Sequence, residues 1–117
     1  MILMAYLKKY SGEILLKIEN GYIKEYSGLI KYKVVDNKVQ EFSGRTIFVL
    51  DGEKVKDYSG RILLCITHNQ VKEYTGKIIA TFDSTYIKTF AGMIEYRLDG
   101  FLTRREMMAL LALIYAS

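Results

Sequence analysis

Apolar and polar residues alternate along most of this chain with a period of two. After Gly28, the segment LIKYKVVD places Ile30, Tyr32 and Val34 on one face and lysines on the other. The same slots hold apolar residues in other segments: Ile14, Leu16 and Ile18, then Ile62, Leu64 and Ile66, then Ile78, Ala80 and Phe82. Alternation of β-branched and aromatic residues predicts strands with one buried face.

The alternating segments belong to a repeat of 16 residues. Six glycines are spaced at this interval without an insertion: Gly12, Gly28, Gly44, Gly60, Gly76 and Gly92. An aromatic residue stands two positions before each glycine: Tyr10, Tyr26, Phe42, Tyr58, Tyr74 and Phe90. A period of this length over six units predicts a repetitive architecture.

A second turn signal lies halfway through most units, as in Asn20-Gly21 and Gly52-Glu53. These dipeptides favour two-residue hairpin turns of types I′ and II′. Each unit is therefore predicted to be one β-hairpin, and the chain an up-and-down meander of about twelve strands. Treating Ser27-Gly28 as a two-residue loop as well predicts that Glu25 pairs with Ile30 and Ile23 with Tyr32.

The two arms of each unit are unequal, which predicts that the meander closes. Seven residues lie between turns in one arm (13–19) and five in the next (22–26). Pairing around both turns staggers the strands and gives a tilt of roughly 37°, as in barrels. Closure requires Ile2–Tyr10 to meet Met93–Leu98. An open sheet with a helix packed on one face and a solenoid of 16-residue coils are the alternatives.

The last part of the chain predicts a helix over residues 103–116. Thr103 and Glu106 have the spacing of a capping box, and every residue from Met107 to Ala116 is apolar or Tyr. A helix that is apolar on all sides is typically buried. We therefore expect it to thread the barrel, in a single domain (1–117) whose hairpin repeats occupy residues 1–100.

Twelve antiparallel strands closed around a hydrophobic C-terminal helix resemble the architecture of tubby-like barrels. The resemblance is one of outline, because the units here are shorter and more regular. It implies binding of phosphoinositides or of membrane surfaces, and it carries over no binding residue.

Composition narrows the possible environments and partners. The 117 residues have a net charge of +4, with one cysteine. The mild basic excess does not by itself indicate a specific nucleic-acid partner, and one cysteine excludes an internal disulfide framework. The start, MILMAYLKKY, lacks the order of a secretory signal. We expect a cytoplasmic protein.

Neither catalysis nor cofactor or metal binding is predicted. His68 lies in a turn signal next to Asn69, and Cys65 is flanked by Leu64 and Ile66 in a predicted strand. A small buried hydrophobe is the simpler interpretation of this cysteine. No nucleophile–base pair or common zinc-ligand set can be assembled, so we expect a non-enzymatic protein.

Four acids precede the turn aromatics by one residue: Glu25, Glu41, Asp57 and Glu73. Parity places them with the apolar face, near one mouth of the barrel. A cation or amine site at that rim is one interpretation. The competing one is a solvated edge whose acids pair with neighbouring lysines.

The opposite face carries the sharpest functional prediction. In units 3 to 5, apolar residues occupy outward slots that hold lysines in unit 2, and the turn aromatics of these units lie beside them. The predicted interface comprises Phe42, Ile47, Val49, Tyr58, Leu63, Cys65, Tyr74 and Ile79. Apolar patches of this kind mark interfaces, so we expect a structural or interaction module that forms a homodimer.

Two other features of this face bear on function. Phe42, Tyr58 and Tyr74 are predicted to stack with the cations at 45, 61 and 77. The alternative function is binding of a small hydrophobic ligand in the lumen, or of an anionic lipid or membrane surface by the basic, aromatic exterior.

Overall fold

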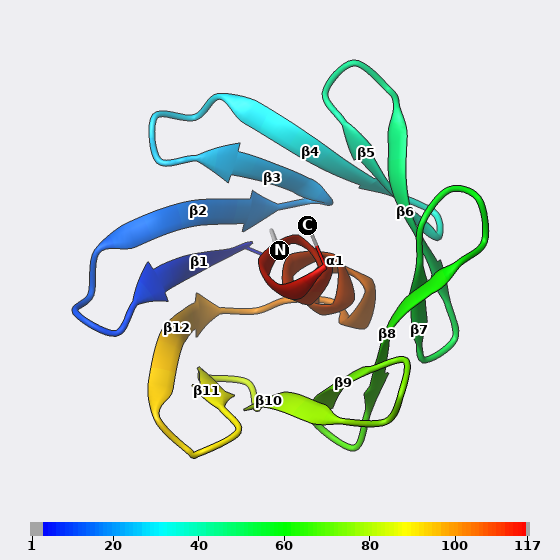
Figure 1. The fold of residues 1–117 in the computed structure, drawn as a ribbon. Coiled ribbons are helices and arrows are strands. Elements are labelled where there is room, and N and C mark those ends of the chain that lie inside the picture. Colours follow the sequence, from blue (N-terminus) through cyan, green and yellow to red (C-terminus); the bar gives the residue numbers. More distant parts are fainter. Residues whose placement is uncertain (1–3, 117) are drawn as a thin grey trace.

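The computed structural model describes residues 4–116 and has twelve strands and one helix. The strands form one closed antiparallel barrel in which consecutive strands are neighbours, and the helix lies inside it (Figure 1). The elements are β1 Met4–Lys9, β2 Ile14–Glu19, β3 Tyr22–Glu25, β4 Ile30–Val35, β5 Lys38–Glu41, β6 Thr46–Asp51, β7 Lys54–Lys56, β8 Ile62–Thr67, β9 Gln70–Glu73, β10 Ile78–Phe82, β11 Tyr86–Thr89, β12 Ile94–Gly100 and α1 Arg104–Tyr115. The closed barrel was predicted, and the open sheet and the solenoid are excluded.

Tight turns such as Asn20-Gly21 form one edge of the barrel, which we call the entry rim because the helix begins there. Around this turn Ile18 pairs with Ile23 and Glu19 with Tyr22, as a two-residue loop requires. Asn20 and Gly21 both have positive φ, of 53° and 81°, which is the conformation of a type I′ turn. The register predicted for this edge is confirmed.

The glycines of the 16-residue repeat form the other edge, which we call the tip rim. Here the predicted two-residue loop is wrong. The amide of Gly28 donates to the carbonyl of Glu25 at 2.9 Å, and the amide of Glu25 donates to the carbonyl of Leu29 at 2.8 Å. The loop therefore has three residues, Tyr26 to Gly28, and Gly28 supplies the positive φ of 97° that closes such loops.

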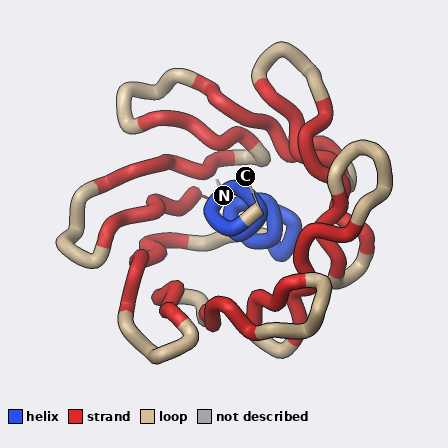
Figure 2. Tube along the Cα trace, viewed as in Figure 1, coloured by secondary structure: helices blue, strands red, loops and turns tan. Residues whose placement is uncertain are grey.

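One extra residue in the following strand restores the expected pairing deeper in the barrel. Lys24 pairs with Ile30, whereas Ile23 pairs with Tyr32, so the register shifts by one residue between these pairs. The predicted pair Ile23–Tyr32 is confirmed and Glu25–Ile30 is not. The shift is a β-bulge, which bends a strand and increases its twist. Figure 2 shows the hairpins and the loops at their tips around the helix.

The barrel closes where β1 meets β12. Five consecutive pairs join the two strands, from Ala5 with Gly100 to Lys9 with Tyr96. Beyond the pair of Ala5 with Gly100, the amide of Phe101 donates to the carbonyl of Met4 at 3.0 Å. The predicted contact between the two ends of the sheet is confirmed, apart from Ile2 and Leu3, which lie outside the described residues.

The helix fills the centre of the barrel. Residues Met108 to Ala112 are at most 3% exposed, and they pack in one cluster with inward residues of the strands, including Ile18, Val39 and Val71. A helix apolar on all sides is stable in water only when it is enclosed in this way. The lumen is thus a packed core along the middle of the helix.

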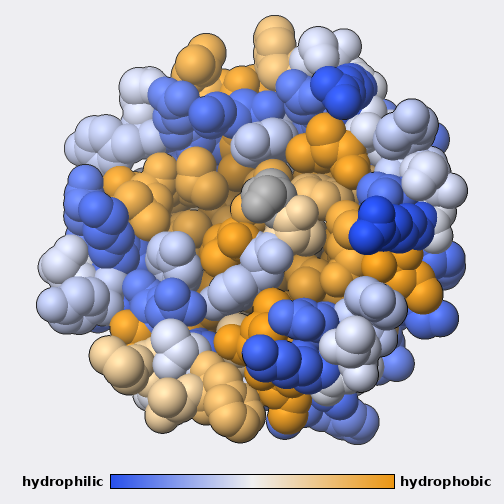
Figure 3. Space-filling model, viewed as in Figure 1, coloured by the Kyte–Doolittle hydropathy of each residue, from blue (hydrophilic) through white to orange (hydrophobic). Residues whose placement is uncertain are grey.

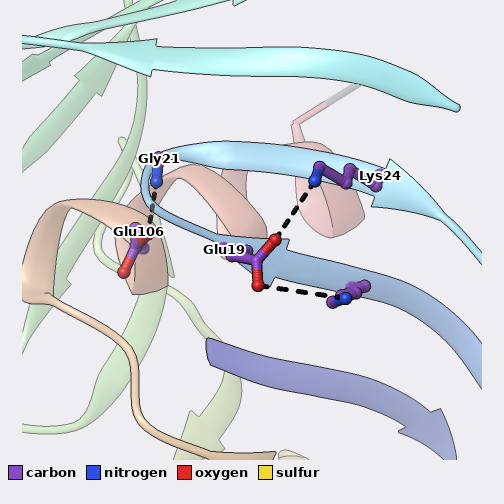
Figure 4. Close-up of polar contacts among 5 residues, drawn as sticks. Glu19, Gly21, Lys24 and Glu106 are labelled. Carbon is purple, nitrogen blue, oxygen red and sulfur yellow. Dashed lines mark hydrogen bonds and ion pairs between the residues drawn. The ribbon is translucent and has the colours of Figure 1, made fainter. Parts of the chain in front are cut away.

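Each end of the helix is held by a polar contact with the barrel. At its start, the Glu106 carboxylate, which is 4% exposed, accepts from the amides of Thr103 (2.9 Å) and Gly21 (2.8 Å). The Thr103 hydroxyl accepts from the amide of Glu106 at 3.1 Å, which completes the predicted capping box. Figure 4 shows Glu106 reaching the β2–β3 turn.

At the other end, the Tyr115 hydroxyl donates to Glu95 at 2.8 Å, close to the tip rim. Burial, and secondarily this carboxylate, raise the pKa of Tyr115 well above its usual value. The helix therefore runs from the entry rim to the tip rim, so that its first turn and its last turn border opposite openings of the barrel.

Candidate interaction surface

The aromatic residues of the repeat stand exposed on the tips of the hairpins. Phe42, Tyr58 and Tyr74, which belong to three successive hairpins, are 64%, 77% and 70% exposed. They are the first residues of the three-residue loops, so they project beyond the paired part of each hairpin. These three predicted interface residues therefore form the most accessible part of the predicted interface.

The strand residues of the predicted interface are less accessible to solvent than the alternation along the strands suggested, which places them on the outward face. Ile47, Leu63 and Ile79 are half-buried and pack against the hydrophobic core. Each lies at the bulge that follows a tip loop, where the register of its strand shifts. A bulge re-aims a side chain, so these three residues present only part of their surface to solvent.

Val49 and Cys65 face outward from β6 and β8 between lysines. Val49 pairs across the sheet with Lys38 on one side and Lys56 on the other. Cys65 pairs likewise with Lys54 and Lys72. Over β6 to β8, at the right of Figure 3, apolar and hydrophilic side chains lie side by side. The aliphatic stems of the lysines join the apolar residues into one amphipathic surface.

The predicted stacking of Phe42, Tyr58 and Tyr74 on neighbouring cations is wrong. Within residues 4–116, the structure has one contact of this type, with Lys88 lying 5.8 Å from the ring centre of Tyr86. The prediction assumed a two-residue loop, which would place each aromatic opposite the residue after the glycine. The three-residue loop removes that pairing and leaves the rings free at the tips.

The four acids of the tip rim are held on separate hairpins. Glu25 lies 3.6 Å from Lys31, and Glu41 lies 3.6 Å from Arg45. Asp57 accepts from the amide and hydroxyl of Ser59, and from the amide of Arg61; the Ser59 hydroxyl contributes most to lowering its pKa. Among the described residues, the side chain of Glu73 makes no hydrogen bond or ion pair of this kind. These contacts support the view that the acids solvate the rim and stabilise its turns.

The described residues hold no group of three His, Cys, Asp or Glu side chains that would bind a metal ion. His68 is in the turn between β8 and β9 with a positive φ of 49°, and Cys65 is a half-buried free thiol in β8. The structure brings neither of them to a base or a partner carboxylate.

The tip of the β11–β12 hairpin differs from the other tips. The other tips carry an acidic residue, a residue with a hydroxyl group and often a basic residue. This tip has Thr89, Ala91 and Met93 instead. Phe90 and Met93 are 69% and 70% exposed. The departure from the repeat was visible in the sequence, so this uncharged tip could have been singled out there.

Two clefts border the start of the helix at the entry rim. The first, of about 520 Å³, lies beside the β2–β3 turn and includes Asn20, Asp36 and Arg105. The second, of about 410 Å³, lies between the helix and strands β8 to β10 and includes Phe82, Asp83 and Met108. Arg104 lines both. Sequence patterns gave no signal for these clefts, since they depend on how the helix sits in the lumen.

Within residues 4–116, the helix falls short of the length and hydrophobicity that a membrane-spanning helix needs. Comparison of the chain with protein-family models, with curated proteins and with solved structures found no match. The resemblance to tubby-like barrels therefore stays a prediction.

Proposed function

We propose that this protein is a non-catalytic interaction module that self-associates through the hairpins β5–β6, β7–β8 and β9–β10. The observation that supports the proposal best is the exposure of Phe42, Tyr58 and Tyr74 on three neighbouring tips. Exposed aromatic clusters are costly in water and are enriched at interfaces. The outer strands beneath these tips carry Val49 and Cys65, where the first two hairpins carry lysines at positions 17 and 33.

The three tip aromatics supply about half of the area that a dimer needs from each partner. An aromatic side chain buries about 150–250 Å², so three rings that are 64–77% exposed offer roughly 300–500 Å². A stable interface takes about 800 Å² from each partner. The lysine-flanked strand surface between the tips supplies the remainder. An isologous dimer, in which the same surface is used twice, is the simplest assembly.

Substitution of the tip aromatics tests the proposal without disturbing the core. We expect the wild-type chain to be a dimer by light scattering, and the variant with Phe42→Ser, Tyr58→Ser and Tyr74→Ser to be a folded monomer. The matched control replaces Tyr10, Tyr26 and Phe90, the aromatics of the other three tips, with serine. Because these are similarly exposed at 69–74%, the control should remain dimeric with a similar melting temperature.

A wild-type chain that stays monomeric well above about micromolar concentration would refute self-association. If the dimers of both triple variants dissociate equally, all six tips contribute to association and the outer strands of β5 to β10 do not determine which tips associate. If the wild-type chain is monomeric, the uncharged β11–β12 tip becomes the favoured binding surface. Its exposed Phe90 and Met93 favour contact with a membrane surface, and co-sedimentation of the chain with lipid vesicles would be the next measurement.

A further inference from the structure

The cleft between the helix and strands β8 to β10 is lined by apolar side chains together with two side chains of opposite charge. Its volume is about 410 Å³, within the range of small-molecule sites. Ile66, Phe82, Met107 and Met108 contribute its apolar lining. Asp83, Ser84 and Arg104 contribute polar groups.

The cleft exists because a twelve-stranded barrel encloses more space than one helix fills. The helix packs most closely against β6 and β4, which leaves space beside β8 and β10. The cleft is therefore set by the strand number and the position of the helix. Methionine side chains adapt their shape to what they contact, so Met107 and Met108 suit a site for an apolar group.

The two charged side chains of the cleft, Asp83 and Arg104, have opposite signs. Asp83 Oδ1 accepts from the amides of Thr85 (2.7 Å) and Tyr86 (2.8 Å). These hydrogen bonds, that of Thr85 first, lower the pKa of Asp83 and keep it ionised. Arg104 supplies a guanidinium that donates a long hydrogen bond, of 3.4 Å, to the carbonyl of Ile66. A ligand with a single charge would meet one favourable and one unfavourable group here.

We propose that this cleft binds a small zwitterion with an apolar body, of which an apolar α-amino acid is the simplest example. The carboxylate of the ligand pairs with Arg104, its ammonium group pairs with Asp83, and its side chain lies among Phe82, Met107 and Met108. At about 30 Å³ for each water in the liquid, the cleft has room for about a dozen non-hydrogen atoms, which is the size of phenylalanine.

The other cleft of the entry rim fits this ligand poorly. Val34 is the one apolar side chain in its lining. Gly21 and Glu106, which also line it, already bond to each other at 2.8 Å. It therefore lacks the aromatic and methionine side chains that line the second cleft. Arg105, which lines the first cleft but not the second, provides a matched control for Arg104.

Calorimetric titration with L-phenylalanine, 3-phenylpropionate and phenethylamine tests the proposal on the intact chain. We expect phenylalanine to bind at one site with a Kd of about 0.1–1 mM. Arg104→Gln should weaken binding of phenylalanine by about tenfold or more, and Asp83→Asn likewise, because each removes one charge-assisted hydrogen bond. Asparagine keeps the Oδ1 acceptor on which the turn depends. Arg105→Gln should bind phenylalanine as the wild type does.

The single-charge compounds separate zwitterion recognition from non-specific apolar binding. Both should bind more weakly than phenylalanine, with phenylpropionate sensitive to Arg104→Gln and phenethylamine sensitive to Asp83→Asn. The proposal is overturned if phenylalanine does not bind, if its affinity is the same in the Arg104→Gln variant, or if phenylpropionate binds more tightly. The outcome is independent of self-association, because the cleft and the tips of β5 to β10 lie at opposite rims.

Discussion

Replacing Gly100 with alanine is expected to destabilise the protein by about 4 kcal/mol or more, a size reached by few single substitutions. A Cβ atom at position 100 would lie against the carbonyl oxygen of Met4 and 2.8 Å from Cα of Ala5. Both are backbone atoms of β1, so relief requires the β1–β12 seam to open. Residue 100 also has a φ of +120°, which L-residues rarely adopt. Chemical denaturation monitored by circular dichroism measures the loss.

The matched control is Gly60→Ala at the tip rim. Gly60 has a φ of +96°, but a Cβ there meets nothing within 4 Å. Only the cost of the left-handed conformation remains, about 1–2 kcal/mol. Similar losses for the two variants would mean that β1 and β12 are not in contact at Gly100.

The second large effect is expected for Glu106→Ala, with a loss of about 3 kcal/mol. The carboxylate is 4% exposed and accepts from the amides of Gly21 and Thr103. Its removal leaves two amide donors without their partner, and hydrogen bonds to charged groups contribute about 1.5–3 kcal/mol each. The free energy of unfolding, from denaturant titration, gives the size of the effect.

Thr103→Ala separates the link to the barrel from the capping of the helix. This change removes the hydroxyl that accepts from the amide of Glu106, and loss of such a cap costs about 1 kcal/mol. If Glu106→Ala were no more harmful than Thr103→Ala, the contact with Gly21 would contribute nothing, and the carboxylate would act only as part of the capping box.

Most of the fold could be predicted from the sequence because the same pattern of alternating apolar residues and turn residues recurs in six units. Alternation identified the inward residues, such as Ile18 and Ile23, and the turn dipeptides identified the entry rim. Loop length at the tip rim was not predicted correctly. A Tyr-Ser-Gly segment is compatible in composition with a two-residue or a three-residue loop. The bulge at Lys31 then restores the pairing that the shorter loop would give, as in Ile23 with Tyr32.

The candidate sites were less accessible to sequence reasoning. The exposure of Phe42, Tyr58 and Tyr74 follows from the loops, whereas the partial burial of Leu63 and Ile79 follows from the bulges and was not foreseen. The bond between Glu106 and Gly21 joins residues 85 positions apart, which no local pattern encodes. The cleft beside β8 and β10 depends on the position of the helix within the barrel. The sequence alone does not determine that position.

The most direct test of the central claim, a barrel closed around its own C-terminal helix, is a nuclear Overhauser spectrum of the labelled protein. The structure predicts cross-strand contacts along the seam, from Ala5 with Gly100 to Lys9 with Tyr96. It also predicts that the methyl groups of Leu110 and Leu111, which are fully buried, contact different parts of the barrel wall, because consecutive helical residues point about 100° apart. Absence of the seam contacts, or leucine contacts confined to one side of the sheet, would contradict the closed barrel and the proposals that depend on it.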